Sequence, residues 1–349
     1  MWAGIPIIDC KYPNRPGTND KFFYLRDLAT AFGYTTIKLE LSVAYASKYN
    51  QTPWGTPGSL AELLAESSMD AVIGDASIER VQFSAFSLAH DENNPWNYHW
   101  YKSVADTIET EFYDACVYLR DQYDGTGKEF IMANWEGDWQ LLNDLNRLKP
   151  VPVVRLGSYA DWHRRRLRAL RQAMADTAGS DVTLRYGLEM NRVRDRYSLR
   201  LVTDIMPKLT LDPADCLISL SHYEAIEGWN EGITVTADLQ ADIETKMQDV
   251  FDRVRAYAPA GLPIIIGEYA WPALAPYFPG SLDMIALHGT VYNKAAALGC
   301  EGIFFWQLCD NEQYPSTTDP LGFCLYNRDG DNATVGSLTD AGTFWATKV

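Results

Sequence analysis

A short apolar run followed by a longer helical pattern recurs along the chain, and this alternation constrains the fold more than any other feature. Apolar strands that alternate with helices are typical of a parallel sheet whose two faces are covered by helices. The eight candidate strands are Pro6–Asp9, Thr36–Leu41, Gln82–Ser87, Phe130–Asn134, Thr183–Leu188, Cys216–Ser221, Pro263–Glu268 and Gly302–Gln307.

The segments between these strands show helical spacing. In Val104–Gln122, apolar residues follow one another at intervals of three and four. The other main helices are expected at Lys21–Phe32, Leu60–Glu66, Asp161–Thr177, Ala241–Tyr257 and Leu282–Leu298. Eight strand–helix units in 349 residues predict an α/β fold, a (β/α)8 TIM barrel. We expect one catalytic domain over residues 1–349, with loop insertions at the C-terminal face of the barrel.

A doubly wound open sheet is the alternative fold. Such a sheet normally has a glycine-rich phosphate-binding loop after its first strand. The segment that follows the first strand here reads "IIDCKYPNRPG", which lacks that pattern. The barrel is therefore the preferred prediction.

The charge of the chain restricts its partners. The formal net charge is −16, which disfavours nucleic acids and anionic membrane surfaces. No stretch of about 20 apolar residues is present, so no membrane span is expected. The only dense basic segment, "HRRRLRALR" at His163–Arg171, has helical spacing and is interpreted as a solvated helix face. We expect an extracellular or periplasmic protein, although no signal peptide is visible, and the oligomeric state stays open.

The cysteines and histidines do not indicate a metal or another cofactor. None of the six cysteines forms a Cys-x-x-Cys pair, and no His-x-His follows the first strand. Cys116, Cys216 and Cys300 stand among apolar residues and are expected in the core. Cys309 and Cys324 flank one loop and could form a disulfide.

The candidate site residues follow the strands, because the active site of such a barrel forms at the C-terminal ends of its strands. After the fourth strand, "FIMANWEGDW" places two carboxylates between two tryptophans. The candidates are Asn134, Trp135, Glu136 and Asp138 after the fourth strand, Glu189 and Asn191 after the fifth, His222 and Tyr223 after the sixth, Glu268, Tyr269 and Trp271 after the seventh, and Trp306 and Gln307 after the eighth.

This collection of carboxylates and aromatic side chains suits sugar chemistry. Aromatic faces stack on sugar rings, and two carboxylates can cleave a glycosidic bond, one as acid/base and one as nucleophile or base. The fourth and seventh strands are nearly opposite each other in an eight-stranded barrel, so Glu136 and Glu268 can flank one bond. The sequence therefore predicts a glycoside hydrolase whose substrate is an oligosaccharide or polysaccharide.

The same segments resemble the clan of (β/α)8 retaining glycosidases that includes cellulases, mannanases and β-galactosidases. The clan carries its acid/base glutamate after strand four, its nucleophile after strand seven and a tryptophan sugar platform after strand eight. The resemblance of "IIIGEYAWP" implies that Glu268 is the nucleophile, and that of "FFWQ" implies that Trp306 is the platform. "SHYE" resembles the strand-six motif of the clan through His222 and Tyr223.

Strand four departs from the clan pattern. The clan places an asparagine directly before its acid/base glutamate, whereas here Trp135 separates Asn134 from Glu136. Glu189, in "LEMN", is therefore the alternative acid/base. "TIKLELS", "NWEGDW" and "DNE" together also resemble a group of bacterial barrel proteins, and that resemblance implies no activity.

Two other classes of function stay open. A non-catalytic carbohydrate-binding barrel, or pseudo-enzyme, would use the same aromatics but hold its carboxylates too far apart for chemistry. A metal-dependent barrel enzyme, such as an aldolase or an amidohydrolase, is less compatible with only five histidines. The sequence does not indicate which sugar or linkage is recognised, or whether cleavage is endo or exo.

Overall fold

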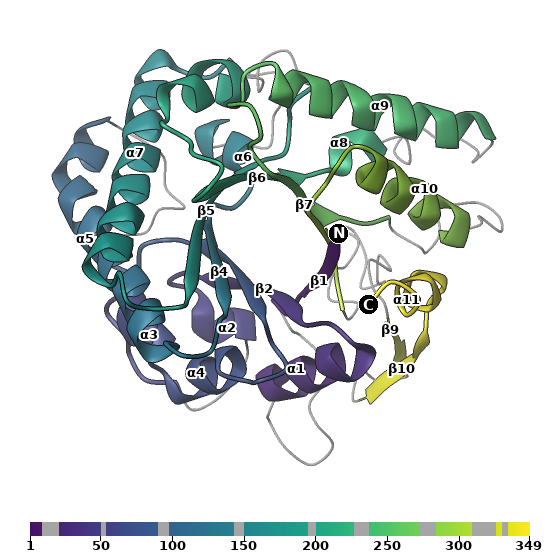
Figure 1. Ribbon diagram of the computed structural model, residues 1–349, viewed down its shortest axis with the longest axis horizontal. Coiled ribbons are helices and arrows are strands. Elements are labelled where there is room, and N and C mark those ends of the chain that lie inside the picture. The colour runs from purple at the N-terminus through teal and green to yellow at the C-terminus, as the bar shows by residue number, and fades with distance from the viewer. Residues whose placement is uncertain are drawn as a thin grey trace.

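The chain forms a closed barrel of eight parallel strands, β1 to β8, in sequence order (Figure 1). The computed structural model describes residues 1–8, 21–49, 54–89, 98–142, 150–194, 200–226, 237–271, 284–308, 326–329 and 334–349. The barrel strands are β1 Trp2–Pro6, β2 Thr36–Leu41, β3 Arg80–Ala85, β4 Glu129–Ala133, β5 Thr183–Met190, β6 Cys216–Ser221, β7 Ile264–Tyr269 and β8 Gly302–Phe305. The predicted (β/α)8 barrel is confirmed.

Helices surround the barrel on its outside (Figure 1). The longer ones are α1 Lys21–Phe32, α5 Tyr98–Gln122, α7 Val153–Asp176, α9 Ala237–Arg255 and α10 Met284–Ala297. Shorter elements are α2 Tyr45–Tyr49, α3 Leu60–Leu64, α4 Ser67–Ile73, α6 Gly137–Leu142, the π-helix η1 Leu201–Ile205, the 3-10 helix η2 Met206–Lys208, α8 Tyr223–Ile226 and α11 Asp340–Trp345. An antiparallel pair, β9 Tyr326–Asp329 and β10 Thr334–Leu338, lies outside the barrel.

The predicted bounds of the first strand are wrong. The strand was expected at Pro6–Asp9, but β1 begins at Trp2 because Trp2 pairs with Gly302 of β8 and closes the barrel. The bounds of β2 and β6 agree with the prediction. The helices α5 and α7 begin earlier than expected, at Tyr98 and Val153. The apolar spacing continues into these earlier turns, with Tyr101 buried in α5 and Leu156 and Tyr159 buried in α7.

The end of the barrel at which the strands begin is filled with side chains. Ile131, Leu217, Ile265 and Phe304 form an apolar layer inside it, with Trp2 packed against them. Gly302 of β8 makes room for Trp2, since a Cβ there would stand 2.2 Å from the indole Cε2. The interior is therefore a packed core rather than a pore, and open space for a ligand is expected only at the C-terminal ends of the strands.

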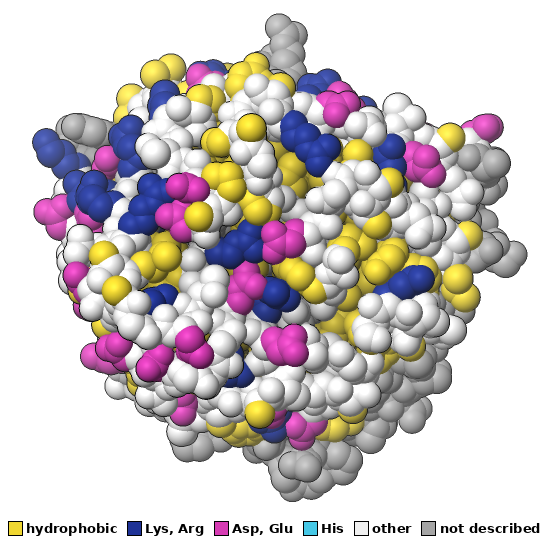
Figure 2. Space-filling model, viewed as in Figure 1, with side chains coloured by type: hydrophobic (Ala, Val, Ile, Leu, Met, Phe, Trp, Pro, Cys, Tyr) yellow, Lys and Arg dark blue, Asp and Glu magenta, His cyan; other side chains and the backbone are white. Residues whose placement is uncertain are grey.

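Charged residues pair at the surface of the molecule. Figure 2 shows basic and acidic side chains next to one another across the visible face. In the basic segment of α7, Arg165 and Arg168 pair with Glu109 of α5, as a solvated helix face predicts. His163 and Arg166 depart from that prediction: both are buried, and the guanidinium of Arg166 lies over the ring of Trp162.

The described cysteines agree with the sequence. Cys116, Cys216 and Cys300 are buried and free, as expected for core cysteines. Cys309 and Cys324, the proposed disulfide pair, lie outside the described residues. Within the described ranges, no helix is both long enough and apolar enough to cross a membrane.

Candidate active site

A bulge in β7 directs Glu268 into the barrel. Ile266 pairs with Ile303 of β8, but the next pair is Tyr269 with Phe305, so β7 has an extra residue at this point. A bulge breaks the alternation of side chains and can redirect one of them. Gly267 and Glu268 consequently both face the interior: a Cβ on Gly267 would meet Ser219, and Glu268 binds a lysine inside the barrel.

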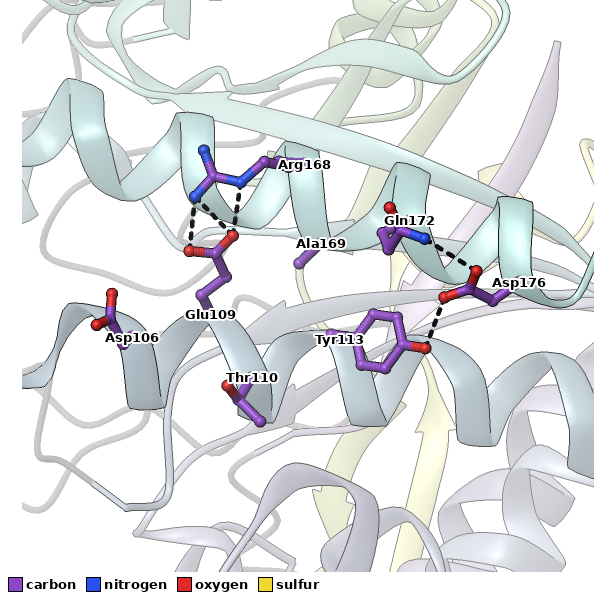
Figure 3. A pocket seen from close by; sticks show the side chains of 8 residues that line it. All are labelled: Asp106, Glu109, Thr110, Tyr113, Arg168, Ala169, Gln172 and Asp176. Carbon is purple, nitrogen blue, oxygen red and sulfur yellow. Dashed lines mark hydrogen bonds and ion pairs between the residues drawn. The ribbon is translucent and has the colours of Figure 1, made fainter.

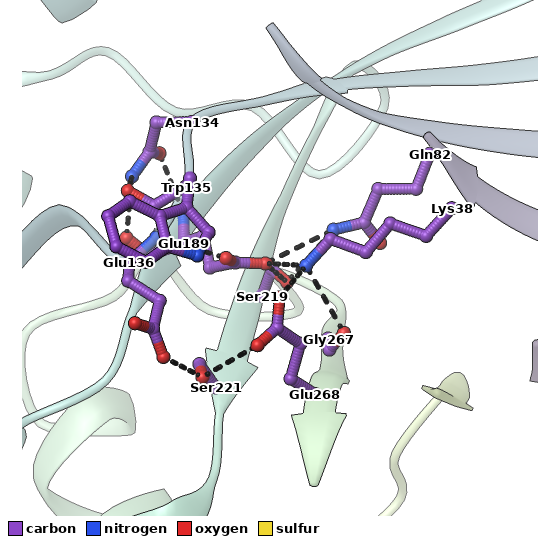
Figure 4. A network of polar contacts seen from close by, with 10 residues as sticks. All are labelled: Lys38, Gln82, Asn134, Trp135, Glu136, Glu189, Ser219, Ser221, Gly267 and Glu268. Carbon is purple, nitrogen blue, oxygen red and sulfur yellow. Dashed lines mark hydrogen bonds and ion pairs between the residues drawn. The ribbon is translucent and has the colours of Figure 1, made fainter. Parts of the chain in front are cut away.

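That lysine is Lys38 of β2, and its side chain is fully buried. The ammonium lies 2.7 Å from Oε1 of Glu268 and 3.0 Å from Oε2 of Glu189 (Figure 4). Burial lowers the pKa of Lys38, but the negative charges of Glu189 and Glu268 outweigh burial and raise it above the ordinary value. Glu189 and Glu268 therefore favour the charged form of Lys38.

Glu189 of β5 is fully buried, and both of its carboxylate oxygens accept hydrogen bonds from the protein. Oε2 accepts from Lys38, from Gln82 of β3 at 3.2 Å and from Ser219 of β6 at 2.8 Å. Oε1 accepts the backbone N–H of Glu136 at 3.0 Å. The contacts of Glu189 thus join β2, β3 and β6 to the segment after β4 (Figure 4).

Glu136 follows β4, after Asn134 and Trp135, and its carboxyl group lies across Ser221 from that of Glu268. Its backbone has φ 28°, in the left-handed region that non-glycine residues seldom adopt. The hydroxyl oxygen of Ser221, at the end of β6, lies 2.5 Å from Oε1 of Glu136 and 3.5 Å from Oε2 of Glu268, so its single hydrogen can be donated to either carboxyl group. One hydroxyl thus lies between the two candidate catalytic carboxylates (Figure 4).

The environment of Glu136 favours its neutral form. Burial is the largest cause that raises the pKa of Glu136, and the negative charge of Glu268 raises it further. The hydrogen bond from Ser221 and the charge of Lys38 act in the opposite direction, but the net result is a pKa well above the ordinary value. Glu136 can therefore keep a proton to a higher pH than an ordinary glutamate.

Asn134 joins β4 to β5 rather than pointing into open space. Its amide nitrogen donates to the carbonyl oxygen of Glu189 at 2.8 Å, and its Oδ1 accepts the N–H of Glu189 at 2.9 Å. The side chain is fully buried. Both ends of the amide are therefore occupied by the backbone of the neighbouring strand.

Asp138 and Asn191 form a second buried group beside the site. Oδ2 of Asp138 accepts the backbone N–H groups of Asn191 and Arg192 at 2.7 and 3.0 Å. With its amide oriented as its neighbours require, Asn191 also donates to Asp138 and accepts from the indole N–H of Trp139. These contacts order the backbone that follows β5.

Three sequence-predicted residues face the helix layer instead of the barrel axis. The ring of His222 packs edge-on against Phe251 of α9, and burial lowers the pKa of His222 to about 3. Tyr269 lies within hydrogen-bond distance of His288 of α10, and Trp271 packs against the same histidine. Tyr269 and Trp271 are 0% and 2% exposed, so a sugar could not stack on either ring in this conformation.

The remaining candidates differ in exposure. Trp135, Trp306 and Tyr223 are half-buried, so part of each ring is accessible to a ligand, whereas Gln307 is buried. Figure 4 shows Trp135 next to Glu136, which follows it in the chain. Trp135, Tyr223 and Trp306 are therefore the aromatic residues of the candidate set that combine a place after a strand end with an accessible surface.

The candidate set from the sequence leaves out four polar residues that hold the carboxylates, namely Lys38, Gln82, Ser219 and Ser221. A signal was present in each case: all four are polar residues inside strands that are otherwise mainly apolar. Lys38 and Gln82 are both 0% exposed, which for such residues requires polar partners. Polar residues in the interior of barrel strands, and not only those after the strands, would have indicated them.

No other described region offers a comparable arrangement. A groove of about 520 Å³ lies between α5 and α7 on the outside of the barrel (Figure 3). Its polar side chains contact one another, as in the pairs Glu109–Arg168 and Tyr113–Asp176. Within the described ranges, no group of three or more His, Cys, Asp or Glu residues could hold a metal ion.

Gly267 is expected to be indispensable for the network. A Cβ at this position would stand 1.9 Å from Oγ of Ser219 and 2.7 Å from Oε2 of Glu189. Gly267→Ala should therefore displace both side chains and lower the melting temperature. Gly157→Ala, on an exposed position of α7 with no atom within 4 Å of the new Cβ, should leave it unchanged or slightly higher. Equal melting temperatures in a thermal unfolding experiment would contradict the close packing.

Comparison with known proteins places the fold. No protein-family model and no curated protein sequence matches the chain. Among solved structures, a family 5 xyloglucanase from Paenibacillus pabuli matches with a TM-score of 0.61 and 15% identity, over 99% of this chain and 97% of that one. A family 5 lichenase from Caldicellulosiruptor sp. F32 matches with a TM-score of 0.55 and 13% identity, over 93% and 87%.

A third structure, a glycoside hydrolase family 5 enzyme from Prevotella bryantii B14, matches with a TM-score of 0.54 and 10% identity, over 88% of both chains. The protein therefore shares the barrel fold of family 5 glycoside hydrolases. The resemblance extends over nearly the whole chain in the first of these structures. At such low identity it is a likeness of fold, and the chemistry must be argued from the site itself.

Proposed function

We propose that the protein is a retaining glycoside hydrolase in which Glu136 is the acid/base and Glu268 the nucleophile. The main support for this proposal is that both carboxyl groups contact Ser221, whose Oγ lies 2.5 Å from Glu136 and 3.5 Å from Glu268. The nearest oxygens of the two carboxyl groups are thus at most about 6 Å apart, which is compatible with the separation of about 5–5.5 Å between the carboxyl groups of retaining enzymes.

The environment of each carboxyl group suits its proposed role. Protonated Glu136 gives its proton to the leaving glycosidic oxygen, while the carboxylate of Glu268 attacks the anomeric carbon and the glycosidic bond breaks. The ionised Glu136 then takes a proton from water, whose oxygen displaces Glu268 from the sugar. The raised pKa of Glu136 supports the first step, and the ammonium of Lys38 supports a charged nucleophile.

The proposed substrate is a β-linked glucan, xyloglucan or mannan. The solved structures of similar fold include a xyloglucanase and a lichenase complex with cellotetraose. The half-buried indoles of Trp135 and Trp306 offer apolar faces for sugar rings. The test is incubation of the purified protein with carboxymethylcellulose, lichenan, xyloglucan and β-mannan, with reducing ends as the readout. Release from at least one polymer is expected, and release from none would overturn the proposal for this class.

Glu136→Gln should slow turnover of a polysaccharide by about 10²–10⁴-fold, because the leaving oxygen then lacks its proton donor. A glycoside with a 2,4-dinitrophenolate leaving group needs no such proton, so the step that forms the glycosyl-enzyme should slow far less. Rates for both substrates, measured on the variant and the wild type, provide the check. An equal loss on both would contradict the role of Glu136 as acid/base.

The pH profile gives a separate prediction for Glu136. Because its pKa is raised, Glu136 stays protonated to a higher pH than an ordinary glutamate, and activity is lost only as the pH rises through that pKa. The basic limb of kcat/KM should therefore lie well above the ordinary range for a carboxyl group. With the dinitrophenyl substrate, the rate of the step that forms the glycosyl-enzyme should show no basic limb. A basic limb that persists unchanged for that step would assign it to another group.

A non-catalytic carbohydrate-binding barrel is the second candidate. The low exposure of Glu268, at 3%, favours it, because a nucleophile must reach its substrate. This alternative predicts that a polysaccharide binds in isothermal titration calorimetry but yields no new reducing ends. The polysaccharide incubation described above therefore separates the two functions.

A further inference from the structure

Glu189 contacts both halves of the proposed catalytic pair through its two carboxylate oxygens. Oε1 accepts the backbone N–H of Glu136 at 3.0 Å. Oε2 accepts from the ammonium of Lys38 at 3.0 Å, and the same ammonium lies 2.7 Å from Glu268. A single buried side chain thus connects the backbone of one catalytic glutamate to the counter-ion of the other (Figure 4).

The backbone of Glu189 holds the same turn. Its N–H and C=O groups bond to the two ends of the Asn134 amide, two residues before Glu136. Glu136 has φ 28°, a strained conformation that persists only when surrounding contacts enforce it. Asn134 and Glu136 are both held by Glu189, with the inserted Trp135 between them. These contacts provide a physical reason for the unusual Asn-Trp-Glu order.

The charges in this part of the barrel do not balance one to one. Among the described residues, the ionisable groups with the largest effect on the pKa of Glu136 are Glu268 of β7, Glu189 of β5 and Lys38 of β2. One ammonium therefore serves two carboxylates while a third carboxyl group faces them. The carboxylate of Glu189 competes with that of Glu268 for Lys38, and its negative charge also adds negative potential at Glu136.

We propose that Glu189 is a positioning residue of the glycosidase: it fixes the backbone of the acid/base Glu136 and shares Lys38 with the nucleophile Glu268. This inference rests on the proposed function for the roles of the two glutamates. It assigns no contact with substrate to Glu189, because both of its oxygens are occupied and the side chain is 0% exposed.

The proposal has a consequence for protonation. Loss of the charge on Glu189 removes negative potential from Glu136 and leaves Lys38 to act on Glu136 and Glu268 alone. Both changes act in the same direction and lower the pKa of Glu136. A purely structural role for Glu189 would reduce stability without a directed change in the titration of Glu136.

The test is a titration of Glu136 followed by NMR in protein with 13Cδ-labelled glutamate, where the resonance missing from Glu136→Gln identifies Glu136. In Glu189→Gln, the midpoint for Glu136 should move to lower pH. In Glu189→Asp, which keeps the charge, the midpoint should stay closer to that of the wild type. Glu111→Gln is the matched control, since Glu111 is also buried and accepts backbone N–H groups, from Leu60 and Leu88, but lies outside the barrel.

The same variants separate this inference from the proposed function. The NMR midpoint requires no turnover, so it can be measured even if the wild-type protein cleaves none of the polysaccharides. A midpoint in Glu189→Gln that equals those of the wild type and Glu111→Gln would overturn the positioning role. If the protein is active, the basic limb of kcat/KM should move with the midpoint in Glu189→Gln and stay in place in Glu111→Gln.

Discussion

Glu268→Gln is expected to abolish turnover, with a loss on the order of 10⁴-fold or more on every glycoside that the wild type cleaves. Glutamine has nearly the same shape but supplies no carboxylate to attack the anomeric carbon. The loss should be equally large on polysaccharides and on dinitrophenyl glycosides, because a better leaving group does not replace the nucleophile. Initial rates on both kinds of substrate provide the measurement.

The control for Glu268→Gln is Glu244→Gln, on an exposed position of α9. This control removes the same charge from the protein surface and should retain wild-type rates. Circular dichroism spectra of both variants should match that of the wild type, since the barrel layers below Glu268 are unchanged. Residual activity of Glu268→Gln within tenfold of wild type would rule out Glu268 as the nucleophile.

Lys38→Met is expected to cause the largest loss of stability, about 3–5 kcal/mol in the free energy of unfolding. Methionine fills a similar volume, but it leaves Glu189 and Glu268 inside the barrel without their shared cation. Breaking a buried pair is costly because the remaining charges stay desolvated and uncompensated. Urea unfolding at pH 7, with the midpoint and slope compared between variant and wild type, provides the measurement.

The double variant Lys38→Met/Glu189→Gln tests the cause of that loss. It removes one of the two carboxylates that Lys38→Met leaves without a cation, and it should therefore be more stable than Lys38→Met alone. Lys48→Met is the surface control: Lys48 pairs with Glu40 at 3.4 Å but is 30% exposed, so the expected loss is at most about 1 kcal/mol. A similar loss of unfolding free energy in Lys38→Met and Lys48→Met would contradict the claim that the buried ammonium of Lys38 stabilises the fold more than a surface ion pair does.

The fold could be predicted from the sequence because its signal is repeated along the chain. Apolar strands such as Cys216–Ser221 and helical spacing such as that of α5 are local patterns, and their alternation suggests one main architecture. The ends of the elements were less predictable. The start of β1 depends on the pairing of Trp2 with Gly302. This contact joins the first strand of the barrel to the last, so no local sequence pattern contains it.

The candidate site was predictable only in part. The rule that catalytic residues follow barrel strands led to Glu136 and Glu268, and the structure brings both to the hydroxyl of Ser221. The orientation of side chains was harder to infer. The bulge at Gly267 changes the alternation along β7, so that Glu268 faces the interior while Tyr269 faces α10.

Lys38 shows why the rest of the network was missed. A lysine within a strand is ordinarily expected at an edge or in solvent, because an isolated buried ammonium is costly. Here the compensating carboxylates come from β5 and β7, which are 151 and 230 residues away in the sequence. Such long-range compensation is a property of the closed barrel and has no local signature.

The most direct test of the two-glutamate mechanism is mass spectrometry of the protein after reaction with 2,4-dinitrophenyl 2-deoxy-2-fluoro-β-cellobioside, or with the corresponding mannobioside. The fluorine slows both steps, and the good leaving group allows the first, so the glycosyl-enzyme should accumulate. We predict a mass increase of one fluorinated disaccharide, located by peptide sequencing on Glu268 and absent from Glu268→Gln. A label on Glu136 or Glu189, or an unlabelled protein that hydrolyses cellobiosides with inversion, would contradict the mechanism.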